Sequence, residues 1–270
     1  MNPLIDCHTH IHQHESIEHK EIINRSLSAN VKIIVCAGTS IEDSIHSISL
    51  SDKFSNVYSG VGIHPTELKT YGEKESNKIK ELSQNKKVIC ISEIGLDYQD
   101  DKTNKILQKE AFRDQLNIAK SVNLPVIFHV REKNDDFEAW NCRKDIIDIL
   151  RTDLSVDGVA HYFQGNWNFA KKLLDLGIYI SFAKPILRIK ELEETIKKVP
   201  NDMYVVETDS YPQPFKKNRN KWTEPYQIPE IIKKVSDIRK SSVEKISIDT
   251  TRNTLSVFSK HQKELENKLQ

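Results

Sequence analysis

Eight short apolar runs, each followed by a polar or amphipathic segment, constrain the fold of this chain more than any other feature. The runs are continuously apolar and rich in β-branched residues, instead of alternating between apolar and polar positions. Such runs are typical of strands buried on both faces, and hence of a parallel sheet. We predict the first strand from Pro3 into the stretch 6–12, and the others at 31–38, 57–65, 87–98, 124–131, 158–163, 177–183 and 203–210.

Helical patterns fill the intervals between these runs. We predict helices at about 15–29, 40–53, 74–84, 104–121, 136–151, 167–176, 190–198, 229–240 and 242–258, followed by a charged tail. Eight such units fit an α/β fold of the closed (β/α)8 TIM-barrel type with an additional C-terminal helix. An open doubly wound sheet is the alternative, but no Gly-rich phosphate-binding motif follows the first strand. We expect one hydrolase domain over residues 1–270.

The composition and charge of the chain indicate where the protein is expected to reside. The net charge is +1 and charged residues make up 29% of the chain, so no global basic field indicates a nucleic-acid binder. No apolar run approaches the roughly 20 residues that cross a bilayer, and no signal-peptide pattern opens the chain. We therefore expect a cytoplasmic protein with no membrane association and no obligate protein partner. The four cysteines are scattered without a CxxC motif, which favours buried free thiols.

The stretch DCHTHIH, residues 6–12, carries the first candidate site. If strand alternation holds, Asp6, His8 and His10 point one way, and Cys7 and Thr9 point the other. Two imidazoles one residue apart at a strand end can bind one metal ion from the same side. The alternative is two ordinary histidines that form hydrogen bonds in a loop.

Further candidate ligands end the later strands, where the active sites of such barrels lie. They are His64 after the third run, Glu93 in the fourth, His129 and Arg131 in the fifth, His161 in the sixth, and Glu207 and Asp209 in the eighth; the seventh offers little. Each has a structural alternative, such as a core histidine, a solvent-side acid or a turn residue. Together they predict a metal site.

The motifs at these strand ends resemble those of the TatD family of metal-dependent deoxyribonucleases, within the amidohydrolase-like superfamily. The matching pieces are DCHTHIH (6–12), GVGIHP (60–65), ISEIGLDY (91–98), PVIFHVR (125–131), HYFQGN (161–166) and VVETDSYP (205–212), with weaker matches at 218–225 and 250–258. They cover almost the whole chain in the family's order. HVREKNDDF at 129–137 and the segment before Pro225 depart from the commoner forms.

This resemblance implies a centre of one or two divalent ions, Mg²⁺, Mn²⁺ or Zn²⁺. The first ion would take His8, His10, Glu93 and Asp209, and the second would share Glu93 and add His129 and His161. A carboxylate can bridge two ions because it has two oxygens. No lysine stands at the end of the fourth strand to form a bridging carbamate, so Glu93 is the expected bridge.

The chemistry expected of such a centre is hydrolysis. A bound ion lowers the pKa of its water from about 15.7 towards 7, and two ions about 3.5–4 Å apart can hold the attacking and leaving oxygens of a phosphodiester. Asp209 would accept the proton as general base, and Glu93 would act beside it as the bridge. His64 and Arg131 would contact a phosphate oxygen. Alternatively, His64 caps the turn before Pro65 and Arg131 pairs with a nearby acid.

Three functions follow from this pattern. The first is a deoxyribonuclease acting on DNA, in particular on single strands or 3′ ends. The second is a hydrolase of a small amide, ester or phosphate, since an activated water attacks carbonyl and phosphoryl centres alike. The third is a non-enzymatic barrel, which loss of a strand-end ligand would favour. The basic run 216–221 and Trp222 form either a strand-binding loop or a solvated loop. We do not expect ligands among His12, His14, His19, His46 and His261.

Overall fold

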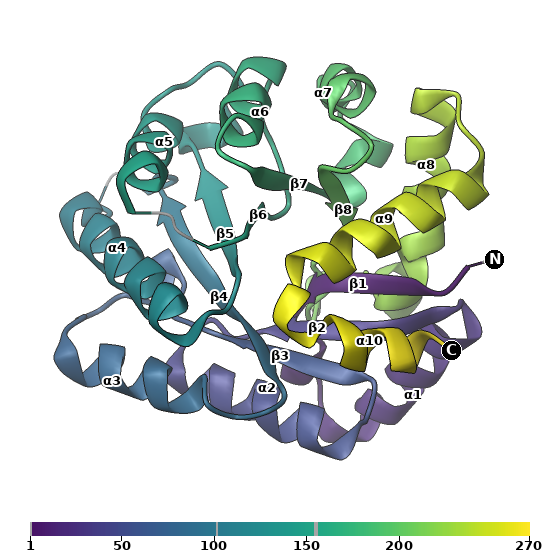
Figure 1. The fold of residues 1–270 in the computed structure, drawn as a ribbon, viewed down its shortest axis with the longest axis horizontal. Helices are drawn as coiled ribbons and strands as arrows, with labels where there is room; N and C mark the ends of the chain where they lie inside the picture. The colour runs from purple at the N-terminus through teal and green to yellow at the C-terminus, as the bar shows by residue number, and fades with distance from the viewer. Residues whose placement is uncertain (1, 101, 154–155) are drawn as a thin grey trace.

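The strands form one parallel sheet that curves into a barrel (Figure 1). A computed structural model describes residues 2–100, 102–153 and 156–270. Its strands are β1 (Leu4–Thr9), β2 (Val31–Ala37), β3 (Val57–Val61), β4 (Val88–Asp97), β5 (Val126–Arg131), β6 (Gly158–Ala160), β7 (Ile178–Phe182) and β8 (Tyr204–Val206). They pair in sequence order, and the predicted TIM-type barrel is confirmed.

Helices cover the outside of this barrel between successive strands (Figure 1). They are α1 (Ser16–Ser28), α2 (Ile41–Lys53), α3 (Glu73–Leu82), α4 (Lys105–Val122), α5 (Cys142–Asp153), α6 (Trp167–Leu174), α7 (Leu192–Lys198), α8 (Ile228–Arg239), α9 (Val243–Val257) and α10 (Gln262–Leu269). None of the described helices is both long and apolar enough to span a membrane.

Several boundaries differ from the sequence prediction. The helix expected at 136–151 begins only at Cys142, where Glu132 Oε1 accepts hydrogen bonds from Asn141 N (2.9 Å) and Arg143 N (3.0 Å). The sixth and eighth strands are shorter than expected, and Tyr162 and Asp209 beyond them have φ angles of 45° and 48°. The charged tail contains α10, which was not predicted as a helix.

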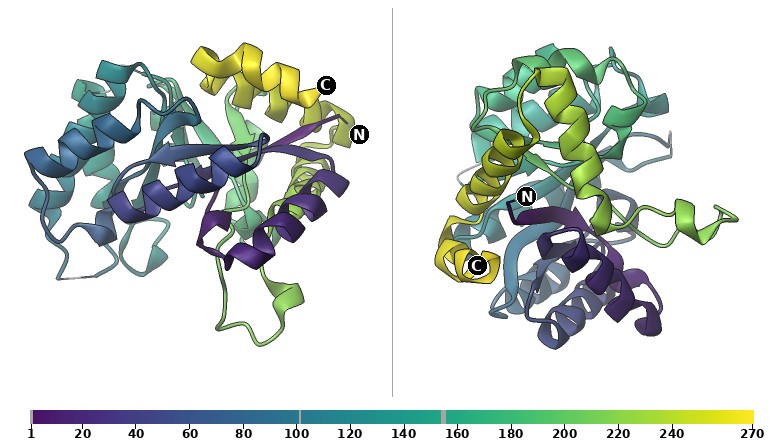
Figure 2. Two further views of the ribbon diagram at one scale, coloured as in Figure 1. Left: turned by 90° about the horizontal axis from the view of Figure 1, so that it is seen from below. Right: turned by 90° about the vertical axis from the view of Figure 1, so that its right-hand side faces the viewer.

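The core has two layers, as expected for a filled barrel. The outer layer packs strands against helices, for example Phe128 of β5 on Phe112 of α4. A second cluster contains alternate strand residues, among them Ile5, Cys7, Val35, Ile127, Val159 and Val205, together with Phe258 and Leu265. The latter two follow or lie on the C-terminal helices. Figure 2 shows α10 at the opposite end of the barrel from the segment that projects after β8.

The barrel is closed by hydrogen bonds between β1 and the segment that follows β8. Asp209 N donates to His8 O (3.0 Å), and His10 N donates to Ser210 O (2.7 Å). Thr208 donates to the Asp6 carboxylate through both its backbone N (3.0 Å) and its hydroxyl (2.5 Å). The first and last candidate ligands of the chain therefore lie on neighbouring segments.

The predicted grouping of Asp6 with His8 and His10 on one face of β1 is wrong. The register of β1 against β2 is irregular between Asp6 and Thr9, so strict period-two alternation does not hold there. Asp6 is fully buried against Thr208 instead of joining His8, whereas Cys7 shares the inner cluster with Ile5. Asp6 thus supports barrel closure and does not face the histidines.

We expect Asp6→Ala to destabilise the fold. The substitution leaves the Thr208 N–H and hydroxyl unpaired in a fully buried place, and each such group costs about 1–3 kcal/mol. Urea unfolding should show a loss of roughly 2 kcal/mol or more, and a smaller loss when Thr208 is already valine. If Asp6→Ala unfolded at the same midpoint urea concentration as wild type, this account of barrel closure would be contradicted.

Candidate metal centre

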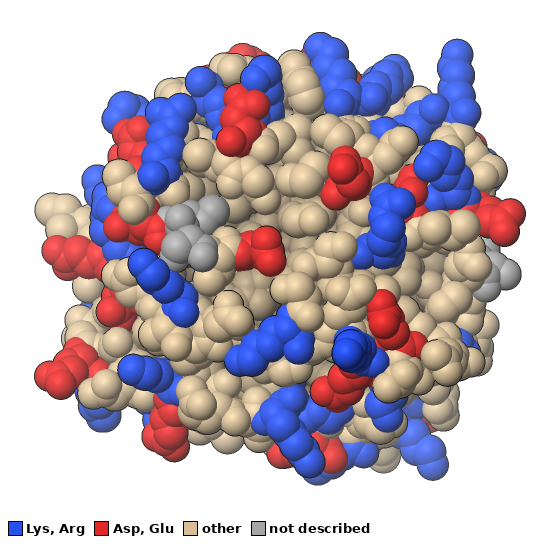
Figure 3. All heavy atoms as spheres, viewed as in Figure 1, with Lys and Arg blue, Asp and Glu red and all other residues tan. Residues whose placement is uncertain are grey.

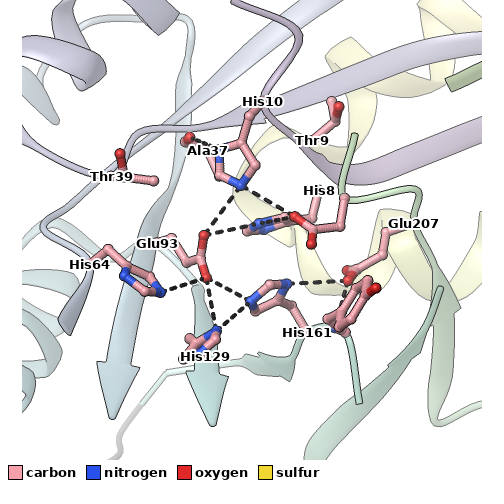
Figure 4. A network of polar contacts seen from close by, with 12 residues as sticks. His8, Thr9, His10, Ala37, Thr39, His64, Glu93, His129, His161 and Glu207 are labelled. Atoms are coloured by element: carbon pink, nitrogen blue, oxygen red, sulfur yellow. Dashed lines mark hydrogen bonds and ion pairs between the residues drawn. The ribbon is translucent and has the colours of Figure 1, made fainter. Parts of the chain in front are cut away.

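Glu93 lies at the centre of a buried cluster of imidazoles and carboxylates at the C-terminal ends of the strands (Figure 4). It belongs to β4 and is 4% exposed. The neighbouring Gly95 has a φ of 132°, and a Cβ there would clash with the carbonyl of His129. A glycine is thus required for β5 to approach β4 beside the cluster.

One carboxylate oxygen of Glu93 faces the ligands of the barrel seam. Glu93 Oε2 is 3.4 Å from His8 Nε2 and 3.3 Å from His10 Nε2. Asp209 Oδ1 lies 3.7 Å and 3.3 Å from the same two nitrogens. Four potential ligand atoms, from β1 and the residue after it, from β4 and from the segment after β8, therefore converge on one point.

The other oxygen of Glu93 faces a separate group of imidazoles. Glu93 Oε1 is 2.7 Å from His161 Nε2, 3.2 Å from His129 Nδ1 and 3.3 Å from His64 Nε2. The structure thus brings together all six predicted metal ligands and adds His64 to the second group. His64 Nδ1 also accepts a hydrogen bond from Thr66 N (3.2 Å), so the turn-capping alternative holds at the same time.

The cluster fits divalent metal ions. His8 is fully buried, yet neither of its ring nitrogens has a hydrogen-bond partner among the described residues. Burying such polar atoms without a partner is costly, and a metal ion would satisfy Nε2. Imidazole nitrogen with carboxylate oxygen suits zinc and manganese, and the carboxylates also suit magnesium.

Second hydrogen bonds orient three of these imidazoles. His10 Nδ1 contacts Ala37 O at 2.8 Å, His129 Nε2 contacts Asp97 Oδ2 at 3.0 Å, and His161 Nδ1 contacts Glu207 Oε1 at 3.2 Å. Such contacts fix the tautomer and aim the opposite nitrogen at a metal. In each ring, the opposite nitrogen points towards Glu93.

The sequence pattern placed Glu207 among the strand-end candidates without assigning it to a metal, and it gave no role to Asp97. Glu207 is fully buried and accepts hydrogen bonds from Tyr162 N (2.5 Å) and Ser181 Oγ (2.6 Å) besides its contact with His161. Both acids stand in strand-end motifs already singled out, so their position was visible in the sequence. Their partners were not, because those come from other strands.

The carboxylates and imidazoles shift one another's pKa values. Burial opposes ionisation of Glu93, but His161 and His64 outweigh it and hold its pKa well below the ordinary range. Burial likewise opposes ionisation of Asp209, and His10 lowers its pKa below the usual value. For His10, burial favours the neutral ring, whereas Asp209 and Glu93 raise its pKa to about 10.

A cavity of about 680 Å³ opens above the cluster. Its lining includes His64, Arg131, Tyr162, Arg188 and Tyr211. Arg131 stands at the exposed part of this lining, where its guanidinium forms a bidentate pair with Asp135 at 2.7 Å and 3.0 Å. Both predicted substrate contacts therefore border the cavity, and Arg131 also has the acidic partner that the alternative expected.

The basic loop after β8 is partly neutralised. Arg219 pairs with Glu18 (2.9 Å) and Glu224 (2.7 Å), and its guanidinium lies over the ring of Trp222 at 4.5 Å. Trp222 also lies 5.6 Å from His14, between ring centroids. Trp222 thus braces the loop against the chain near α1.

A metal-dependent hydrolase is the class of protein that this barrel and its buried cluster define. The sequence profile of the family described as TatD related DNase matches residues 5–259. The metal-dependent hydrolase YabD of Bacillus subtilis is 31% identical over 94% of this chain and 98% of its own length. The chain belongs to the TatD family.

One further relative is named for an activity, and one solved structure shares the fold. The 3′-5′ ssDNA/RNA exonuclease TatD of Cronobacter sakazakii is 27% identical over 89% of this chain and 92% of its own length. The crystal structure of YjjV, a TatD homologue from Escherichia coli K12, superposes with a TM-score of 0.82 at 23% identity, covering 95% and 98% of the two chains. The latter supports the fold alone.

We expect Glu93→Ala to lose metal from both groups, because Glu93 is the one described residue that offers an oxygen to each. His161→Ala should lose chiefly the ion beside Oε1. Elemental analysis of purified variants measures this, with the exposed His46→Ala as control and a melting curve to check folding. Equal metal content in Glu93→Ala and wild type would rule out the bridge.

Metal binding should release protons at neutral pH. Because the pKa of metal-free His10 is raised to about 10, its ring is protonated at pH 7 and must lose that proton to bind a metal. The apparent affinity for the metal ion should therefore increase as the pH is raised, up to about pH 10. Calorimetry in two buffers of different ionisation enthalpy counts the protons; identical heats in both would contradict the prediction.

Proposed function

We propose that this protein is a deoxyribonuclease that hydrolyses phosphodiesters with two divalent ions, held by the six ligands predicted from the sequence. The observation that carries the proposal is the split of Glu93 between two separate groups of imidazoles. The family, and the naming of one relative as a single-strand exonuclease, support DNA as the substrate. Within DNA, we propose single strands and 3′ ends as the substrate.

In the proposed reaction, Asp209 is the general base. When bound, the ions would lower the pKa of a coordinated water and polarise the phosphoryl group. Asp209 faces the same point as His8 and His10, and the lowered pKa keeps its carboxylate ionised and ready to accept a proton. Glu93 would act by bridging, since its two oxygens fix both groups of ligands.

His64 and Arg131 would position the phosphate. His64 Nε2 lies beside Glu93 Oε1, and the ring borders the cavity. Arg131 presents a planar fork of donors, which suits phosphate oxygens, and Asp135 holds that fork at the cavity wall. Both side chains would bring the phosphodiester to the ligand cluster without taking part in proton transfer.

We expect Asp209→Asn to fold and to keep much of its metal, but to lose activity. The amide retains one oxygen for a metal but cannot accept a proton at neutral pH, and such a step contributes roughly 10²–10⁴-fold in rate. The assay is divalent-dependent hydrolysis of a generic phosphodiester, with the exposed Asp202→Asn as matched control. A folded, metal-bound variant retaining more than about a tenth of the rate would show that Asp209 is not the base.

The substrate is tested with end-labelled DNA. Wild-type protein loaded with Mg²⁺ or Mn²⁺ should shorten single-stranded DNA labelled at its 5′ end, and EDTA should abolish the reaction. Metal-dependent hydrolysis of small amides or esters without any DNA cleavage would instead support the small-substrate alternative. No hydrolysis of either with metal bound would reject both.

A further inference from the structure

Three cations that pair with no acid among the described residues stand on the segments that follow β7 and β8, and one of them, Arg188, lines the cavity. Lys184 begins a short 3-10 helix after β7, Arg188 follows that helix, and Lys216 lies on the segment after β8. No ion pair joins any of the three to a carboxylate within residues 2–100, 102–153 and 156–270. Arg131 and Arg219, by contrast, are neutralised by acids.

Neutral groups hold the two lysines of this set in place. Lys216 Nζ donates to Gln213 Oε1 (2.7 Å) and to Lys221 O (3.3 Å), and Lys184 Nζ donates to Gln227 Oε1 (3.2 Å). Burial and the charges of Lys184 and Arg188 lower the pKa of Lys216. The cations are therefore close enough to repel one another, and an anion between them would relieve that repulsion.

Two tyrosines complete this side of the cavity. Tyr162, after β6, and Tyr211, after β8, line the cavity together with Arg188. Tyr211 is 38% exposed, and its hydroxyl makes no hydrogen bond within the described residues. Aromatic faces beside cations are the combination by which proteins hold single-stranded nucleic acids without reading their sequence.

We propose that Tyr162, Lys184, Arg188, Tyr211 and Lys216, here called the β6–β8 rim, bind the nucleotides next to the phosphodiester that is cleaved. The cations would contact backbone phosphates, and the tyrosines would stack on bases. This inference rests on the proposed nuclease function and extends it, because it assigns the residues that hold the nucleotides beside the cleaved bond. An acidic peptide would leave the tyrosines without a role.

The first test removes the charges of the rim. The variant Lys184→Gln/Arg188→Gln/Lys216→Gln is compared with Lys86→Gln/Lys263→Gln/Lys268→Gln, whose lysines are exposed and unpaired among the described residues and lie beside or on α10. On the face carrying α9 and α10, basic and acidic side chains are interspersed (Figure 3). Both variants lose the same charge.

Binding is measured by fluorescence anisotropy with phosphorothioate-linked oligothymidylate and the metal-loaded full chain. We expect the rim variant to bind about tenfold more weakly, and the salt dependence of its log K to flatten by roughly 2, at about 0.7 per phosphate contact. The α10-side variant should bind like wild type. Equal losses in both variants, or no binding by wild type, would overturn the inference.

The second test concerns stacking. Tyr211→Ala should bind oligothymidylate at least about fivefold more weakly, since stacking on one base is worth about 1–3 kcal/mol, whereas Tyr211→Phe should stay within about twofold of wild type. Oligoglutamate of equal charge serves as competitor. If oligoglutamate competed as effectively as unlabelled oligothymidylate, the nucleotide assignment would be overturned. Equal binding by wild type, Tyr211→Ala and Tyr211→Phe would overturn it too.

Kinetics separate this inference from the proposed function. The rim variant should hydrolyse bis(p-nitrophenyl) phosphate with unchanged kcat and KM, but show a raised KM for the oligonucleotide. If wild type cleaves neither substrate yet the binding differences hold, the nuclease proposal fails, and only the binding of an oligonucleotide by the rim is supported. If the variant loses activity on both substrates equally while binding DNA normally, the rim assignment is wrong.

Discussion

The position of Glu93 between two sets of imidazoles depends on how the ends of the barrel strands meet. Hydrogen bonds from Asp209 N to His8 O and from His10 N to Ser210 O join the first strand to the segment after the last. They bring ligands about 200 residues apart in sequence to the same side of Glu93. The buried pairing of Asp6 with Thr208 supports this seam from behind.

Much of this arrangement was predictable from the sequence. Parallel strands place their C-terminal ends together. The apolar runs and the polar residues that end them therefore predicted one cluster of His8, Glu93, His129, His161 and Asp209. The structure brings all of these within contact of one another or of Glu93. Continuous apolar strands likewise predicted a sheet covered on both sides.

The remainder depended on contacts that local patterns do not encode. The irregular register of β1 turns Asp6 away from His8, and no residue in DCHTHIH signals it. The seventh strand seemed to offer little, yet Arg188, on the segment after it, lines the cavity. The sequence does not show that this cation lacks an acidic partner among the described residues, because that depends on the fold. The sequence left open whether Trp222 belongs to a strand-binding loop or to a solvated loop. The folding of that loop places Trp222 against Arg219 and His14.

The most direct test of the account is anomalous diffraction from crystals grown with Mn²⁺ or Zn²⁺. We expect two peaks, one beside Glu93 Oε2 among His8, His10 and Asp209, and the other beside Oε1 among His129 and His161. Glu93 should contact both ions, about 3.5–4 Å apart. Full occupancy by ions that do not contact Glu93, or one ion bound by other residues, would contradict the central claim.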